Sequence, residues 1–245
     1  MDRSYLSNQQ VVSASRDFVC VRLITFEDSQ EAALMKRLLG GRRMVNTAFT
    51  FMDPAGRRAL TRVGRSPSHL FNGAKEMAAR MHEVAKQYPA RKKVKPVDLG
   101  LPVLEDVRVA LNVTECDAQQ LVIVRGSGKK VEAMRKALTE LCWSDKIMGH
   151  FLYADSDDGT DWSAIEGADK APKSCLLIVR SDKYGLTGEV VASVSSSKSK
   201  SAIEAALLKA IKSHRPKAVD TRRVRREGMR NGVKWRAELP IPKFR

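Results

Sequence analysis

The feature that most constrains this chain is a series of short apolar segments in its second half, which alternate between strand-like and helix-like spacing. Residues 121–125 are LVIVR, a continuous β-branched run typical of a strand covered on both faces. Residues 129–142 place apolar side chains at three- and four-residue spacing, which predicts an amphipathic helix. Further strands are predicted at residues 107–113, 150–154, 175–179 and 189–194, with a closing helix at 202–211. Alternating strands and helices predict an α/β fold with a central mixed sheet flanked by helices.

The first half carries a shorter version of the same series. A hairpin is indicated by Asp53-Pro54-Ala55-Gly56, since proline fixes φ at the second turn position and glycine accepts a positive φ. Ser66-Pro67 predicts the start of a long helix, because a capping hydroxyl precedes proline at the first helical position. The other elements predicted there are a helix at 4–15, a strand at 18–25 (FVCVRLIT), a helix at 29–39 and the two hairpin strands at 47–52 and 58–63.

Residues 89–103 separate the two halves. This segment holds three prolines and a basic cluster without apolar periodicity, which is typical of a semi-rigid linker. We therefore predict a first domain at residues 1–88, a second at 104–214 and a basic C-terminal extension at 215–245. Because both halves end in a strand, a helical segment, a hairpin and a helix, the pattern indicates a diverged internal duplication.

This order of elements resembles the thioredoxin superfamily, and the first half looks most like divergent bacterial thioredoxin-like proteins. The segment MVNTAFTFMDPAGRRALTRVGR, together with the preceding RDFVCVRL, carries the resemblance in the first half. The resemblance implies two tandem thioredoxin-like domains, the first of which lacks its N-terminal part. It also implies a redox dithiol at the start of the helix that follows the central strand, where the helix end lowers the pKa of the attacking thiol.

The second half departs from that family at the dithiol. The corresponding position is occupied by Ser127, Gly128, Lys129 and Lys130, which cannot form and break a disulfide bond. The family also places a cis-proline opposite the dithiol, and Pro172 is the candidate in this chain. These residues predict an architecture without thiol–disulfide chemistry.

The four cysteines, Cys20, Cys116, Cys142 and Cys175, contain no C-x-x-C pair. Cys20 and Cys175 lie inside apolar strand-like runs, so we expect both thiols to be buried as small hydrophobic groups. Cys116 and Cys142 could form a disulfide bond if the protein is exported, and the sequence does not decide whether they do. No spacing of histidines, cysteines or acidic residues predicts a metal site or a cofactor.

The net charge of +16 is concentrated at the C-terminal end, because residues 213–245 carry an excess of eight positive charges. The candidate polyanion-binding or partner-binding residues of this segment are Arg222, Arg223, Arg225, Arg226, Arg230, Lys234, Trp235 and Arg236. Arginines bind phosphates and tryptophan stacks on bases, so the segment fits nucleic acid. The sequence VKWRAEL also alternates like an edge strand that packs on a domain.

The leading interpretation is a redox-inactive thioredoxin-like protein that serves as a protein-binding or scaffold module. One alternative is a thiol–disulfide oxidoreductase whose C-x-x-C motif lies upstream of Met1. Another is a protein that binds nucleic acid or another polyanion through its basic tail, which the sequence favours less. The sequence contains no apolar run of the roughly 20 residues that a membrane helix needs. The start of the chain has no signal peptide, and an extracytoplasmic location stays open if translation begins further upstream.

Overall fold

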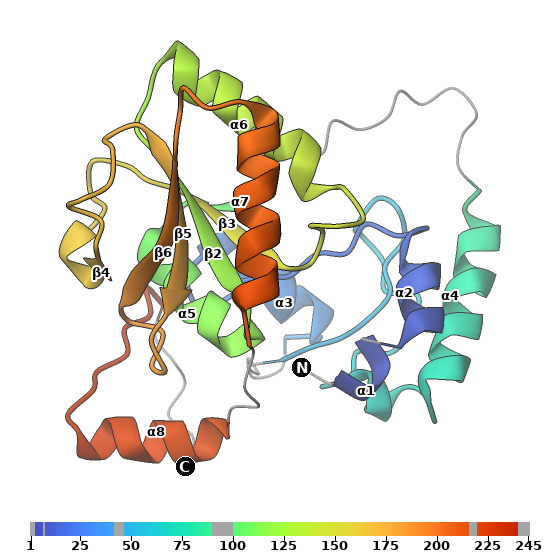
Figure 1. Cartoon of the computed structure of the whole chain (residues 1–245). Helices are drawn as coiled ribbons and strands as arrows, with labels where there is room; N and C mark the ends of the chain where they lie inside the picture. Colours follow the sequence, from blue (N-terminus) through green and yellow to red (C-terminus); the bar gives the residue numbers. More distant parts are fainter. Residues whose placement is uncertain (1–2, 7, 42–46, 90–99, 216–219, 240–245) are drawn as a thin grey trace. The chain divides into compact units, whose positions relative to one another are not determined.

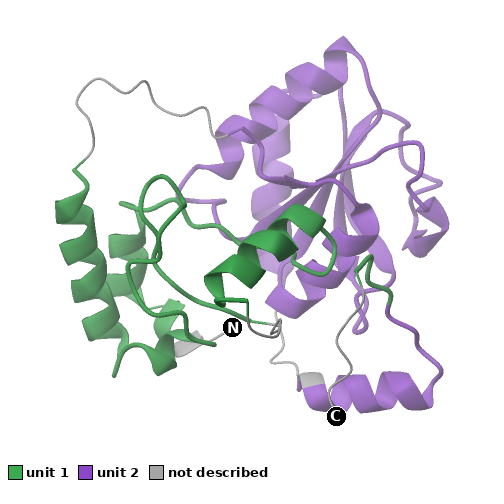
Figure 2. Ribbon diagram, turned by 180° about the vertical axis from the view of Figure 1, so that it is seen from behind, with its two compact units in different colours: residues 1–97, 236–245 green, residues 98–235 purple. Residues whose placement is uncertain are grey.

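The computed structural model describes residues 3–6, 8–41, 47–89, 100–215 and 220–239. The chain divides into two compact units (Figure 2). Unit 1 contains residues 1–97 and 236–245, and unit 2 contains residues 98–235.

Unit 2 is built on a six-stranded mixed sheet with the strand order β1-β3-β2-β5-β6-β4 (Figure 1). Strands β1, β3 and β2 are parallel, and β5 pairs antiparallel with both β2 and β6. The short β4 pairs parallel with β6. The strands are β1 (Val103–Leu104), β2 (Gln120–Arg125), β3 (Phe151–Asp155), β4 (Ile165–Glu166), β5 (Cys175–Ser181) and β6 (Gly188–Ser195).

Helices cover both faces of this sheet, so unit 2 is a three-layer α/β structure (Figure 1). Val122 and Val124 of β2 point to the core formed with α6 (Lys129–Cys142) and α7 (Lys200–Ser213). Leu121 and Ile123 point to the opposite core, formed with α5 (Val107–Asp117). Successive side chains of a strand alternate between faces, which explains why a strand covered on both faces is continuously apolar.

Most of the elements predicted for the second half are confirmed. The predicted helix at 129–142 is α6, the predicted closing helix lies within α7, and strands β2, β3, β5 and β6 occupy the expected segments within one or two residues. The predicted strand at 107–113 is wrong, because Val107 begins helix α5. Apolar residues at 107, 109, 111 and 113 imitate strand alternation, but Asp106 caps the helix by accepting hydrogen bonds from Arg108 N and Val109 N. The first strand of the sheet is instead β1, which precedes α5 in the chain.

Unit 1 is helical where it is regular. Its elements are α1 (Arg3–Leu6), α2 (Gln9–Ser15), α3 (Ser29–Leu38), the 3₁₀ turn η1 (Pro67–His69) and α4 (Ala74–Gln87). Helices α2 and α4 enclose a small core together with four phenylalanines. Phe51 lies at its centre, with ring centroids 5.6 Å from both Phe18 and Phe71 and 5.7 Å from Phe49.

The sheet predicted for the first half is not formed by the described residues of unit 1. Segments 47–52 and 58–63 meet near isolated antiparallel bridges, Phe49 with Gly64 and Met52 with Ala59, and the turn at Asp53 is present. The predicted strand at 18–25 is wrong, because these residues are assigned no strand and Val19 and Val21 are 79% and 73% exposed, whereas a buried strand is covered on both faces. The long helix starts at Ala74 rather than Ser66, since η1 ends at His69 and Gly73 provides the N-cap.

Candidate functional site

The residues of the predicted dithiol position lie directly after β2, at the N-terminus of α6. Gly128 is the N-cap residue, with φ 95°, and Lys129 and Lys130 are the first two residues of the helix. Residues 127–130 are exposed, and the position contains no thiol. The strand-to-helix turn predicted at these residues is therefore confirmed.

The prediction that Pro172 is a cis-proline is wrong. The described residues contain no cis peptide bond, so the bond before Pro172 is trans. Its carbonyl oxygen accepts a hydrogen bond from Cys175 Sγ at 3.0 Å. Pro172 thus helps to hold a buried thiol at the start of β5.

Two of the thiols are sequestered in the cores of unit 2. Cys142 and Cys175 are 3% and 0% exposed, and neither forms a disulfide. Burial raises the pKa of Cys142 to about 11 and also raises the pKa of Cys175. The thiolate is the nucleophilic form of cysteine, and a raised pKa favours the protonated thiol at neutral pH. Cys20 is exposed, which contradicts the expectation that it is buried in a strand.

Residues 221–230 of the basic segment form a helix, whereas VKWRAEL (233–239), which alternates like an edge strand, forms neither a strand nor a helix. Helix α8 (Thr221–Arg230) has Asp220 as its N-cap residue, whose carboxylate accepts hydrogen bonds from Arg222 N and Arg223 N. It ends with Gly232, at φ 73°, where Val233 N donates to Gly228 O at 2.8 Å and Gly232 N to Met229 O at 3.3 Å. This pair of bonds defines a Schellman motif, which closes the helix and turns the chain back along it.

Helix α8 is docked on the turn that joins β5 to β6. The ring of Trp235 packs edge to face on Tyr184 with centroids 6.2 Å apart, and its Nε1 donates to Tyr184 O at 2.9 Å. Lys183 forms an ion pair with Glu227, which lowers the pKa of Glu227. Asn231 Nδ2 also donates to the Tyr184 hydroxyl at 3.0 Å. These contacts define the docked side of α8.

Gly228 makes this docking possible. A Cβ atom at this position would lie 2.4 Å from Trp235 Cη2 and 3.3 Å from Tyr184 Cε1. Glycine in a helix interior costs roughly 1 kcal/mol relative to alanine. The cost is offset because the absence of a side chain lets the tryptophan ring lie against the helix backbone.

The arginines of α8 occupy the side away from the docking contacts. Arg222, Arg226 and Arg230 follow one another at four-residue intervals and therefore form one stripe. Arg223 and Arg225 flank it, so the five guanidinium groups cover an arc of about 160° around the helix. All five side chains are exposed, and Met229, 64% exposed, lies among them. We call these five arginines the arginine face.

The arginine face carries an excess of positive charge over the part of the chain that the structure describes, where Glu227 is the carboxylate that interacts electrostatically with one of its members, Arg223. Across the described residues, no carboxylate forms an ion pair with any of its five guanidinium groups. The acidic residue of the helix, Glu227, is engaged by Lys183 on the docked side. An anionic partner would thus find five available cations on a helix whose position is fixed.

The other predicted residues of the tail have different environments. Trp235 is 37% exposed and its ring is used for docking, so the structure does not present it for stacking on bases. Lys234 is exposed, and Arg236 pairs with Glu238 at 2.8 Å within unit 1. The predicted set of eight is therefore divided into the five arginines of the arginine face, the docking residue Trp235, and two residues, Lys234 and Arg236, that belong to neither group.

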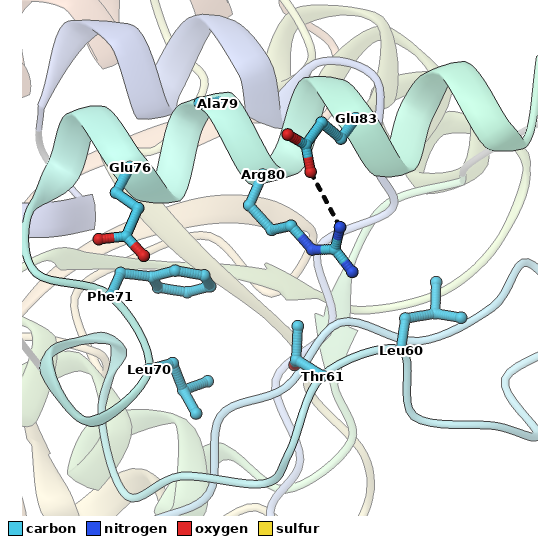
Figure 3. A pocket seen from close by; sticks show the side chains of 8 residues that line it. All are labelled: Leu60, Thr61, Leu70, Phe71, Glu76, Ala79, Arg80 and Glu83. Atoms are coloured by element: carbon cyan, nitrogen blue, oxygen red, sulfur yellow. Dashed lines mark hydrogen bonds and ion pairs between the residues drawn. The ribbon is translucent and has the colours of Figure 1, made fainter.

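Unit 1 contains a shallow pocket of about 380 Å³ between α4 and the segment around residues 60–71 (Figure 3). Leu60, Leu70 and Phe71 form its apolar part, and Arg80 and Glu83 pair with each other at 2.9 Å on its helical side. Glu76, also on α4, accepts a hydrogen bond from Asn72 N at 2.9 Å. Since these charged groups satisfy one another or the backbone, the pocket offers no convergent polar group for a ligand.

Searches with protein-family models, among curated proteins and among solved structures find no match for this chain. Within the described ranges, no helix has the length and apolar content of a membrane span. The same residues contain no group of three or more histidine, cysteine or acidic side chains arranged to hold a metal ion. The arginine face is accordingly the candidate site that the structure defines best.

Sequence reasoning selected the arginines but missed how they are organised. The available signal was the order Asp220, Gly228, Gly232, Trp235: a helix cap, an interior glycine, a helix stop and an aromatic residue that returns to the glycine. The docking partner, Tyr184, lies 51 residues before Trp235 and no local pattern connects the two.

Proposed function

We propose that the chain is a binding protein without thiol–disulfide chemistry, in which a thioredoxin-like unit carries a docked helix that holds an anionic macromolecule. The single observation that carries the proposal is the arginine face of α8: five exposed guanidinium groups with no carboxylate partner among the described residues, on a helix that is capped at both ends and docked through its C-terminal part. Arginine forms bidentate hydrogen bonds with phosphates and carboxylates, and an ordered helix binds without the entropy cost of folding.

The thioredoxin-like relationship of unit 2 is part of the proposal. Its support is the sequence of elements, in which β1-α5-β2-α6-β3 is followed by the β5–β6 hairpin and α7. The parallel order β1-β3-β2 and the antiparallel β5 next to β2 also agree with the arrangement implied by the resemblance. A scaffold role fits this unit because the α6 N-terminus carries lysines in place of a dithiol.

Anion binding is tested by the retention of the full chain on immobilised heparin, used as a generic polyanion. The variant R222Q/R226Q/R230Q removes three charges of the arginine face, while glutamine keeps the helix propensity close to that of arginine. The matched control K146Q/K170Q/K209Q removes three exposed lysine charges elsewhere in unit 2. We expect a clear decrease in the eluting salt concentration for the arginine variant and little change for the control. Equal elution of the two variants would reject the proposal.

The lack of thiol chemistry is tested separately by insulin reduction with dithiothreitol. We expect the chain to leave the rate of insulin precipitation unchanged, because the exposed Cys20 and Cys116 belong to no C-x-x-C pair and Cys142 and Cys175 are buried with raised pKa values. A rate enhancement that disappears after alkylation of the protein with iodoacetamide would contradict this part of the proposal and favour the oxidoreductase alternative.

A further inference from the structure

The arginine face has the charge density of a duplex-binding surface. Its five arginines lie within nine residues, Arg222 to Arg230, which span about 12 Å of helix axis at 1.5 Å per residue. One positive charge therefore falls on about every 2.4 Å of the helix, and duplex DNA presents one negative charge per roughly 1.7 Å of its own axis. The charge spacing of the arginine face is therefore of the same order as that of duplex DNA.

The surroundings of α8 argue against a lipid surface as the partner. An interfacial helix buries a broad apolar side rich in tryptophan, phenylalanine or leucine in the bilayer. On α8 the apolar residue within the arginine face is Met229, while Val224 is half-buried and Gly228 is covered on the docked side. The helix has no apolar side left for insertion.

The geometry also favours B-form DNA over duplex RNA. A helix with its side chains is about 10–12 Å wide, and the major groove of B-form DNA is about 12 Å wide. The major groove of A-form RNA is deep and narrow, so a helix does not enter it. In α8 the docked side is held by Tyr184 and Trp235, which leaves the arginine face directed away from these contacts for insertion.

From these observations we infer that α8 binds the phosphate backbone of duplex DNA along the major groove, through Arg222, Arg223, Arg225, Arg226 and Arg230. The inference depends on the proposed function and names its anionic partner. Neutralising phosphates releases condensed counterions, so binding weakens as the salt concentration rises. Because phosphate contacts carry no sequence information, the binding is independent of base sequence.

The experiment measures fluorescence anisotropy of a labelled 20-base-pair DNA duplex titrated with the full chain at several NaCl concentrations. We expect log K to fall with log[NaCl] with a slope of about −3 to −4.5, for three to five neutralised phosphates. R222Q/R226Q/R230Q is expected to weaken binding at least tenfold and to make the slope shallower by about 3. The control K146Q/K170Q/K209Q is expected to stay within about threefold of the parent chain. Circular dichroism checks that both variants keep their helix content.

Competition experiments decide the partner class. Unlabelled DNA duplex is expected to displace the labelled duplex better than duplex RNA of the same sequence, poly-L-glutamate or phosphatidylserine vesicles. Equal affinity of the two triple variants for DNA would overturn the inference. So would stronger competition by RNA, by polyglutamate or by the vesicles, since each would assign the arginine face to a different partner. If heparin retention still depends on the arginines in that case, the proposed function stands and the choice of DNA fails.

Discussion

At the scale of single residues, Gly228 is a position where a tertiary contact outweighs helix propensity. Its lack of a side chain weakens helix α8 locally, yet it admits the Trp235 ring to the helix backbone. A buried thiol, Cys142, is a second residue whose behaviour depends on its surroundings, because desolvation keeps it protonated. Substitution of either residue is expected to change the free energy of unfolding.

The substitution Gly228→Ala is expected to destabilise the docked tail, although it improves intrinsic helix propensity. The new Cβ would lie 2.4 Å from Trp235 Cη2, so the ring must leave and its hydrogen bond to Tyr184 O is lost. We expect the free energy of unfolding to decrease by about 1 kcal/mol, whereas helix propensity alone predicts an increase of similar size. In a Trp235→Ala background the same substitution is expected to stabilise the protein. Urea unfolding of the double-mutant cycle measures this coupling, and additive effects would contradict the proposed contact.

The Cys142 thiol is expected to make stability decrease at alkaline pH. Its pKa is about 11 in the folded protein, against 9.0 for an unperturbed thiol. The folded state therefore keeps a proton that the unfolded state loses, and the contribution is present below pH 9 and lost as the pH rises towards 11. Two pKa units correspond to about 2–3 kcal/mol.

The measurement is the free energy of unfolding of the parent chain and of Cys142→Ala between pH 8 and pH 11. As the pH rises, the free energy of unfolding of the parent chain is expected to fall relative to that of Cys142→Ala. A difference that stays constant over this range would show that the thiol does not titrate as its burial implies.

At the scale of elements, caps and turns decided the cases in which apolar periodicity was ambiguous. Residues 107–113 satisfy strand alternation, but the Asp106 cap and the burial of Ala110 and Thr114 belong to a helix. In α8, Asp220 and Gly232 define the two ends, and the turn between β5 and β6 supplies the surface on which the helix docks. Element type was set by these short-range polar contacts.

The substitution Asp106→Ala is expected to reduce the free energy of unfolding by about 1 kcal/mol, because α5 loses the acceptor of two backbone N–H groups. The neighbouring exposed residue Glu105 provides the control, since Glu105→Ala removes the same charge without removing a cap. Urea denaturation compares the two variants with the parent chain. A similar loss in both would indicate a general charge effect instead of helix capping.

At the scale of the whole molecule, unit 2 contains the complete sheet and covers both of its faces with its own helices. Unit 1 has a separate small core of α2, α4 and phenylalanines. Because each apolar face is covered within its own unit, the two cores do not require each other.

A fragment of residues 98–235 is therefore expected to fold cooperatively and to keep its heparin retention, since it contains the arginine face with its docking residues. The measurements are a sigmoidal thermal transition by circular dichroism and elution from heparin at the salt concentration found for the full chain. A fragment of residues 98–215, which lacks α8, serves as the control and is expected to fold but to elute earlier. Failure of both fragments to fold would show that unit 2 depends on unit 1.

The sequence by itself determined the α/β class of unit 2, the bounds of α6, the buried strands and the thiol-free turn at Ser127. These features depend on local periodicity and on composition, which are properties of short segments. Tertiary structure decided that residues 18–25 are not a covered strand and that the C-terminal arginines lie on the side of α8 away from its docking contacts. The reason is physical: these outcomes depend on contacts between residues distant in sequence, such as Tyr184 with Trp235, and a local pattern contains no information about which distant side chain will cover it.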